Sequence, residues 1–308
     1  MLRVSTASTY SAMLANLTQA QVRQNAAAEQ VASEKNASDL KGYARNAEVL
    51  TAMRGVQVKV AGFLEQTSQI GGRLDMQEVA MTRMSDSVGS ARTAIADAMA
   101  SDNAGTLMQA LGGFFDDTVA ALNTRHDGRY LFAGGKTDTL PVTATSLSDI
   151  GNPATVAAQF KNDNLTISNR LDENTVMDTG FLASKLGSAA FDAFKSVQDY
   201  VTTNGAFSSP LTEAQKTFLT QKLTEFDAAS KGLTDATASN GLMQSRLESA
   251  VTDLKGRDTA LDVMVGDVTN VNKAEVISKL EQAQLSVAAA AQVFQTLQGS
   301  SLLAILSR

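Results

Sequence analysis

The sequence contains no cysteine, so it can form no disulfide bond, no thiolate metal site and no cysteine nucleophile. Its single histidine, His126, rules out a multi-histidine zinc site and leaves one residue on which a histidine-based triad could be built. Tryptophan is absent, and 308 residues include only 3 prolines and 5% aromatic residues. This scarcity over such a length favours extended helices over a β-sandwich or a barrel.

Long hydrophobic runs and an excess of basic charge are also missing. No stretch approaches the roughly 18 uncharged apolar residues of a membrane-spanning helix, so no membrane insertion is predicted. Residues 1–6 do not lead into a basic segment followed by an apolar run, so we expect no cleaved secretory signal. The 26 basic and 32 acidic residues give a net charge of −6, which offers no field for phosphate backbones. Nucleic acid is therefore not an expected partner.

A seven-residue hydrophobic repeat is the strongest pattern in the N-terminal half. Six of seven positions are apolar in one row, and six of seven are apolar again three residues later. The first row consists of Met53, Val60, Thr67, Leu74, Met81, Val88 and Ile95. Apolar spacing sustained over this many heptads predicts a coiled-coil seam along a helix from about residue 45 to about residue 100. At 1.5 Å per residue, such a helix would be on the order of 80 Å long.

The same repeat returns in the C-terminal half. Its row consists of Phe226, Leu233, Asn240, Leu247, Leu254, Leu261 and Val268. Asn240 is the one polar member, and it either fixes the register of the coiled coil or occupies a partly exposed helix position. Nearer the end, Leu280, Val287 and Phe294 recur every seven residues. Both halves of the chain are therefore predicted to be helical partners.

The central third differs in composition from the two ends. All three prolines lie there, and residues 136–180 are rich in glycine, asparagine, aspartate, serine and threonine. This composition predicts a small irregular or β-containing insert. The expected fold is mainly α, a long antiparallel coiled-coil hairpin built from both chain ends. We expect terminal helices from residues 1–40 with 270–308, a rod from 41–135 with 181–269, and an outward-facing insert from 136–180.

Two short motifs could carry chemistry, and neither is complete. Residues 134–137, with the sequence GGKT, resemble the end of a phosphate-binding loop, but such a loop needs glycine where Tyr130 stands. His126 and Asp127 could form a base and its orienting acid, yet no nucleophile or metal cluster is spaced to join them. We therefore predict no catalytic, cofactor-binding or metal-binding residues and no enzymatic activity.

Apolar stripes at both chain ends need a partner that covers them. The stripe residues predicted to form an interface are Leu14, Leu17, Leu280, Val287, Phe294, Leu297, Leu302, Leu303, Ile305 and Leu306. An isolated helix carrying such a stripe would expose it to water, so the two ends must pack on each other or on other copies of the chain. Self-assembly through the terminal helices is the resulting functional prediction.

Several stretches resemble the flagellin family of bacterial proteins. Residues 272–284 (NKAEVISKLEQAQ) and 302–306 (LLAIL) are similar to the C-terminal motif of that family, and residues 3–6 (RVST) fit its start. Residues 123–135 (NTRHDGRYLFAGG) are more specific and resemble the hook-associated protein 3 branch, the hook–filament junction proteins. The residues that carry this likeness are Asn123, Gly128, Arg129, Tyr130, Phe132 and Gly134.

The resemblance implies a structural subunit of the bacterial flagellum, located outside the cell. Members of the family pass unfolded through the flagellar type III export apparatus with the help of an export chaperone, and their N-terminus is not cleaved. The junction branch self-associates into a ring between hook-associated protein 1 and the flagellin filament. By this resemblance, the terminal helices would form the polymerising core, and the small insert would form a small outer domain.

Three alternatives remain open at the level of the sequence. A filament-forming flagellin paralogue shares the terminal helices, although the stretch from Gly128 to Gly134 argues against it. A type III needle-tip or translocator protein is also a coiled coil with an insert, but translocators usually carry long apolar membrane segments. An enzyme on a helical scaffold is disfavoured by the residue inventory, because no complete catalytic set can be named.

Overall fold

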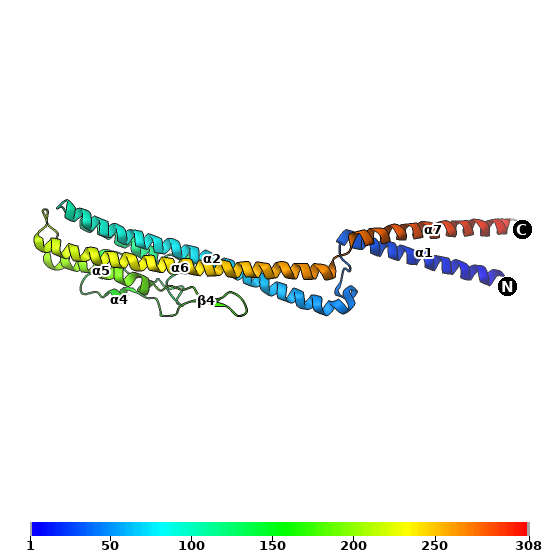
Figure 1. Ribbon diagram of the computed structural model, residues 1–308, viewed down its shortest axis with the longest axis horizontal. Helices are drawn as coiled ribbons and strands as arrows, with labels where there is room; N and C mark the ends of the chain where they lie inside the picture. The colour runs from blue at the N-terminus through cyan, green and yellow to red at the C-terminus, as the bar shows by residue number, and fades with distance from the viewer. Residues whose placement is uncertain (1, 307–308) are drawn as a thin grey trace. The chain divides into compact units, whose positions relative to one another are not determined.

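The computed structural model describes residues 2–306, with side chains described for Ser8 and residues 11–296. The chain is mainly α-helical with two small two-stranded sheets, which confirms the predicted fold class. The elements in chain order are α1 (Leu2–Ser33), η1 (Leu40–Asn46), α2 (Ala47–Ala100), α3 (Leu107–Leu122), β1 (Arg125–His126), β2 (Arg129–Tyr130), η2 (Leu147–Ile150), α4 (Val156–Gln159), β3 (Ser168–Arg170), β4 (Val176–Asp178), α5 (Ala183–Asn204), α6 (Glu213–Thr269) and α7 (Lys273–Leu306) (Figure 1).

The chain divides into two compact units. The first combines the chain up to Lys59 with the chain from Arg257 onward, and the second comprises Val60–Gly256. Long helices α2 and α6 each contribute to both units. The three-part division expected from the sequence places the terminal helices together, and its exact boundaries stay a prediction.

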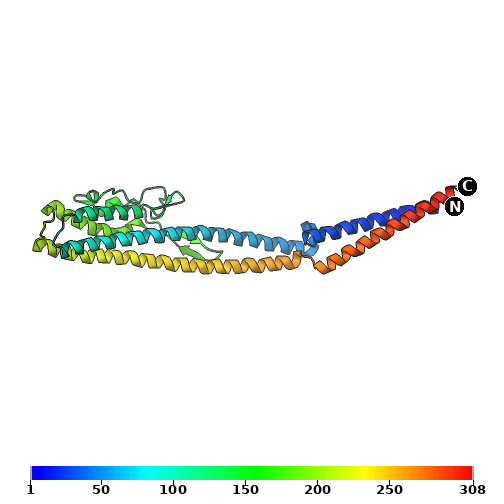
Figure 2. The same ribbon diagram turned by 90° about the horizontal axis from the view of Figure 1, so that it is seen from above.

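In the first unit, α1 and α7 pack against each other as antiparallel helices (Figure 2). Backbone hydrogen bonds join the segment that follows α1 to the segment that precedes α7. Asn36 N–H donates to the carbonyl of Thr269 at 2.7 Å, and Val271 N–H donates to the carbonyl of Glu34 at 3.1 Å. The buried residues among the described side chains of the two helices are Ala20, Ala27, Val276 and Ala283. Alanines allow the two helices to approach closely, so the pair buries little apolar area for its length.

In the second unit, α2 and α6 run antiparallel along a buried seam. Two contacts show the antiparallel direction. Asn240 of α6 bonds to Leu74 of α2, and Asp227, earlier in α6, pairs with Arg92, later in α2. The predicted heptad residues of α2 are fully buried at Leu74, Met81, Val88 and Ile95, and those of α6 are buried at Phe226, Leu233, Leu247 and Leu254. The seven-residue period therefore identified the core-facing side of both helices.

A polar layer interrupts the apolar seam between α2 and α6. Asn240 is fully buried and its amide donates to the carbonyl of Leu74 at 2.9 Å, while its Oδ1 has no partner. Gln77, one turn further along α2, is also fully buried, and neither of its amide atoms is bonded. Of the two interpretations of Asn240, its burial supports a role in fixing the register and not a partly exposed position. Such a layer costs stability, but it penalises any shifted register that would place these amides against apolar side chains.

Helix α2 stops where the backbone closes a capping turn. Asp102 has a positive φ of 54°, Asn103 N–H donates to the carbonyl of Ala98 at 3.0 Å, and Asp102 N–H donates to that of Met99 at 3.3 Å. These two bonds form a Schellman motif, which ends the helix in a left-handed residue. Asp102 also accepts a bond from Leu211 N–H and pairs with Lys216, so the turn after α2 is tied to the start of α6.

An aromatic cluster joins the shorter helices to α6. The ring of Phe115 in α3 lies 4.9 Å from that of Phe191 and 5.5 Å from that of Phe194, both in α5. Phe194 in turn contacts Phe226 of α6 with 4.9 Å between ring centroids. Fully buried rings in edge-on contact contribute large buried area with a fixed geometry. The cluster therefore holds the end of α3, and the motif that follows it, in a defined place.

Candidate assembly site

The heptad stripe of α7 is partly covered by α1. Val276 is 4% exposed and Ala283 is 8% exposed, whereas Leu280, Val287 and Phe294 on the same stripe are half-buried. The structure thus places these predicted interface residues along the contact with α1, while leaving part of each side chain accessible. Part of the apolar surface of the stripe therefore stays exposed to solvent in a single chain.

The other predicted interface residues divide into two groups. On α1, Leu17 is half-buried and Leu14 is 47% exposed. The side chains of five residues of α7 lie outside the described residues, namely Leu297, Leu302, Leu303, Ile305 and Leu306. For those five, the interface role stays a prediction.

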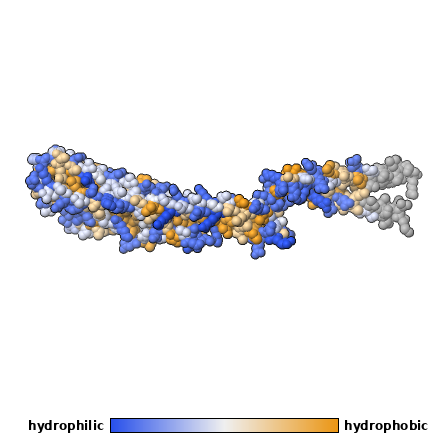
Figure 3. Space-filling model, in the orientation of Figure 1, coloured by the Kyte–Doolittle hydropathy of each residue, from blue (hydrophilic) through white to orange (hydrophobic). Residues whose placement is uncertain are grey.

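Exposed apolar side chains lie at further positions of the two terminal helices, and the heptad analysis missed those of α7. Leu285 is 72% exposed and Val22 is 61% exposed. Ile277, Val293 and Val31 are exposed as well, and apolar atoms reach the surface of this pair (Figure 3). Single exposed leucines are ordinary, but helices that are apolar on several faces are typical of elements buried from several sides. A search for one apolar stripe does not detect apolar residues that lie off that stripe.

Asn123, the first residue of the specific motif, acts as a clamp on the insert. Its Oδ1 accepts from Val142 N–H and its Nδ2 donates to the Val142 carbonyl, both at 3.0 Å. The side chain therefore bonds to Val142 as a neighbouring β-strand would. Because Val142 is fully buried, its two backbone groups depend on this one amide. Asn123 thus joins the end of α3 to a strand-like segment 19 residues later.

We expect Asn123→Ala to lower the free energy of unfolding by about 2–4 kcal/mol, because two buried backbone groups lose their partners. Urea unfolding of the purified chain measures this loss. Asn123→Asp keeps the acceptor for Val142 N–H but sets a carboxylate oxygen against the Val142 carbonyl, so it should not restore the stability lost in Asn123→Ala. Equal stability of wild type and Asn123→Ala would contradict the clamp.

The next motif residues form a tight β-hairpin, which the sequence analysis did not anticipate. Strands β1 and β2 pair antiparallel, with His126 opposite Arg129. The two loop residues between them, Asp127 and Gly128, have φ values of 49° and 76°. Two positive φ values in succession define a type I′ turn, for which Asp-Gly is a preferred sequence. Gly128 is therefore explained by backbone conformation, and Tyr130 is positioned on the hairpin, where its hydroxyl accepts from Arg125 at 2.8 Å.

Phe132 and Gly134 complete the motif as packing residues. Phe132 is fully buried in the main core of the second unit. Gly134 has a φ of 70° and lies so close to Asp163 that a Cβ atom there would collide with its carboxylate. That carboxylate accepts from Gly135 N–H at 2.9 Å and Leu165 N–H at 3.0 Å, and these bonds hold the pKa of Asp163 below its usual value. The glycine pair thus accommodates a carboxylate of the chain itself, not a nucleotide phosphate.

The only histidine has no catalytic surroundings among the described side chains. His126 Nε2 lies 3.4 Å from Asp127 Oδ2, and that carboxylate belongs to a side chain that is 84% exposed. No group of three or more potential metal ligands occurs among the residues searched, which are those that the structure describes. Within the same residues, no helix is long and apolar enough to cross a bilayer.

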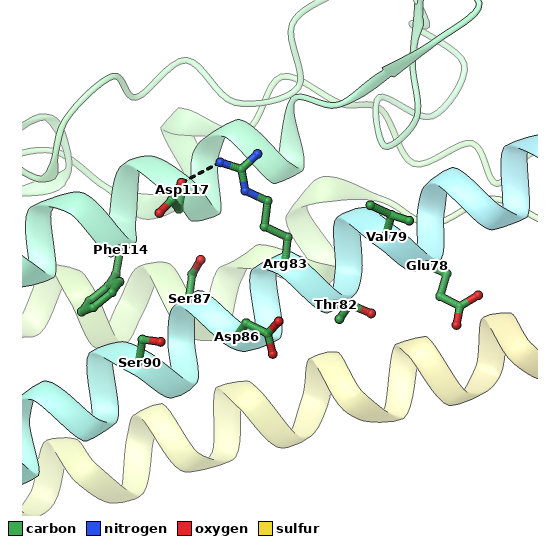
Figure 4. Close-up of a pocket in the computed structure, with 9 residues that line it drawn as sticks. All are labelled: Glu78, Val79, Thr82, Arg83, Asp86, Ser87, Ser90, Phe114 and Asp117. Carbon is green, nitrogen blue, oxygen red and sulfur yellow. Dashed lines mark hydrogen bonds and ion pairs between the residues drawn. The ribbon is translucent and has the colours of Figure 1, made fainter.

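A separate groove of about 480 Å³ lies between α2 and α3 (Figure 4). Arg83 reaches across from α2 to Asp117 of α3 at 2.6 Å, and the hydroxyls of Ser87 and Ser90 lie beyond this ion pair. The single histidine lines a different pocket, so it does not activate either hydroxyl. Both charged partners are about half exposed, and such a pair contributes at most about 1 kcal/mol to stability.

Comparisons with known proteins support the fold. No family model matches the chain, and no curated protein matches its sequence. Among solved structures, one from Vibrio parahaemolyticus described as a flagellar hook-associated protein matches with a TM-score of 0.60 and 15% identity, over 72% of this chain and 96% of that one. FlgL of Bacillus cereus matches with 0.54 and 16%, over 71% and 99%, and FlgL of Xanthomonas campestris matches with 0.54 and 14%, over 69% and 98%. The chain therefore has the fold of these hook-associated proteins.

Proposed function

We propose that this chain is a structural subunit of the bacterial flagellum, the adaptor that joins hook to filament. The main support is a pair of antiparallel terminal helices with apolar side chains on their outer faces, in a chain whose fold matches hook-associated proteins. The stretch from Asn123 to Gly134 supports the junction branch over a filament-forming flagellin. The proposed role needs no catalytic residue, metal or cofactor.

Assembly of the terminal helices follows from their burial. Among the described side chains of α1 and α7, four are buried and three of those are alanines, so a single chain gains limited hydrophobic free energy from the pair. Leu285 and Val22 remain exposed, and burying each such side chain against a neighbouring copy contributes roughly 1.5–3 kcal/mol. Helices this dependent on packing gain most of their stability when neighbours surround them. A ring of copies supplies those neighbours on several sides at once.

The proposed partners follow from the same role. Copies of this chain bind one another through α1 and α7, with hook-associated protein 1 on the hook side and flagellin on the filament side. An export chaperone and the flagellar type III export apparatus handle the unassembled chain, which is exported without signal cleavage and acts outside the cell. Leu14, Leu17, Leu280, Val287 and Phe294 belong to the proposed interface, as do the apolar residues from 297 to 306.

Deletion of the gene tests this proposal. Electron microscopy should show hooks without filaments, and flagellin should accumulate in the culture medium, because subunits are exported but cannot attach. Restoring the gene should restore attached filaments. Normal filaments in the deletion strain would contradict the junction role. A high abundance of this chain along purified filaments would support a flagellin paralogue in its place.

A further inference from the structure

A polar pocket of about 510 Å³ lies in the second unit between α2 and the β1–β2 hairpin. Arg73 lines it from α2, and Arg129 and Tyr130 line it from the hairpin. Neither the fold nor the proposed assembly through α1 and α7 uses this pocket.

Arg73 is half-buried, and its guanidinium has no charged partner among the described residues. One terminal nitrogen of its guanidinium donates to the carbonyl of Leu131 at 3.2 Å, but its Nε is buried without a hydrogen-bond partner. No ion pair joins Arg73 to a described carboxylate, and burial lowers the pKa of its guanidinium. Buried charges in proteins are usually paired, because desolvation without a counter-charge is costly. The pocket therefore holds a cation whose hydrogen bonding is incomplete.

A second cation from the hairpin lines the same pocket. Arg125 is occupied by Tyr130, since its guanidinium lies 4.2 Å from the centre of that ring and bonds to the hydroxyl. The side chain of Arg129, on the neighbouring strand, is exposed and makes no hydrogen bond or ion pair with any described residue. The one acidic residue of the lining, Asp127, is directed toward His126. With the histidine neutral, two arginines and one aspartate leave the lining with a net charge of 2 − 1 = +1, in a chain of net charge −6.

The remaining surface of the pocket adds apolar area and neutral polar groups. Ile70 and Leu131 are 5% and 2% exposed and form apolar walls, while Gln66 and Gln69 contribute side-chain amides. A guanidinium donates two parallel bonds to a carboxylate, and apolar walls favour a carboxylate carried on a short aliphatic chain. The positive charge and the apolar walls of the pocket therefore both favour a carboxylate on a short aliphatic chain.

We propose that this pocket is a binding site for a carboxylate on a short aliphatic chain, held by Arg73 and Arg129. The carboxylate could come from two sources. One is an acidic side chain of a second copy, since each chain has 32 acidic residues, and the other is a free dicarboxylate. The proposal does not depend on the flagellar role, because it rests on the unpaired guanidinium and the lining alone.

NMR of the arginine Nε–H groups in the full ¹⁵N-labelled chain tests the site. The buried Nε–H of Arg73 is assigned by its loss in Arg73→Lys. Titration with glutarate should shift this signal to saturation, whereas glutaramide, which has the same carbon chain without charge, should not. Arg129→Gln should weaken glutarate binding by about tenfold or more, since it removes a charge-assisted bond. Arg246→Gln on α6 is the matched control, because Arg246 is exposed and does not line the pocket.

The outcomes separate the two sources of the carboxylate. A saturable shift with glutarate that Arg129→Gln weakens, and Arg246→Gln does not, supports a site open to free dicarboxylates. A shift that grows with protein concentration without added ligand, and disappears in Arg129→Gln, supports an acidic side chain of a second copy. If the Arg73 signal responds to neither glutarate nor protein concentration, the proposal is overturned, whatever the deletion strain shows about assembly.

Discussion

Replacing Leu285 and Val293 of α7 together by aspartate should abolish filament attachment while leaving the purified chain as stable as wild type. Both side chains are exposed, at 72% and 47%, so their loss removes little from the core of one chain. In the proposed ring we expect both to be buried, so the variant should lose roughly 1.5–3 kcal/mol for each residue per copy. It also buries a carboxylate at each position, which costs several kcal/mol more. Because every copy in the proposed ring carries both changes, this loss of binding free energy occurs at every contact between copies.

Two measurements on the same variant check this expectation. Electron microscopy of a deletion strain that expresses the variant should show bare hooks, and urea unfolding of the purified chain should show an unchanged midpoint. Leu242→Asp is the matched control, because Leu242 is 66% exposed but lies on α6 in the second unit. The control should support attached filaments. If the double variant also does so, the terminal helices do not carry assembly, and if the control fails too, exposed leucines in general are responsible.

Replacing Phe194 by alanine should lower the free energy of unfolding by about 3–5 kcal/mol, the largest effect expected on folding. Phe194 is fully buried, and its ring contacts Phe115 of α3 and Phe226 of α6. Removing it leaves a cavity where three helices meet, and it also loses two aromatic contacts of about 0.5–1.5 kcal/mol each, which are included in that range.

Urea unfolding followed by circular dichroism measures this loss. Phe218→Ala is the control, since Phe218 is only partly buried and stacks on Tyr200 at the edge of the same core. Its loss should be smaller. A loss below about 1 kcal/mol for Phe194→Ala would mean that the aromatic cluster does not hold α3, α5 and α6 together.

Much of the fold was predictable because its main pattern is local in the sequence. The heptad rows predicted which sides of α2 and α6 are buried, since helical periodicity places residues seven apart on one face regardless of what they contact. The break after Ala100 and the insert were predictable from glycine, asparagine and proline content. The hairpin at residues 125–130 was missed because its strands are too short to show alternation, although its Asp-Gly pair is a turn signal.

The candidate site was predictable only in part, for a related reason. A single stripe on α7 was detected, and its residues Leu280, Val287 and Phe294 are half-buried in the single chain, while their role in an interface stays a prediction. The exposed residue Leu285 was not detected, because a heptad search tests for one apolar face.

The sequence by itself determined a helical, cysteine-free chain whose two halves carry matching heptads and whose ends are apolar. Only the tertiary structure decided that Asn123 bonds to Val142, that Asp163 lies against Gly134, and that the Nε of Arg73 is buried without a hydrogen-bond partner. The physical reason is the range of the interactions. Periodicity records which face of a helix is buried, whereas a hydrogen bond or an unpaired charge depends on which distant side chain reaches it, and that is settled only when the whole chain has packed.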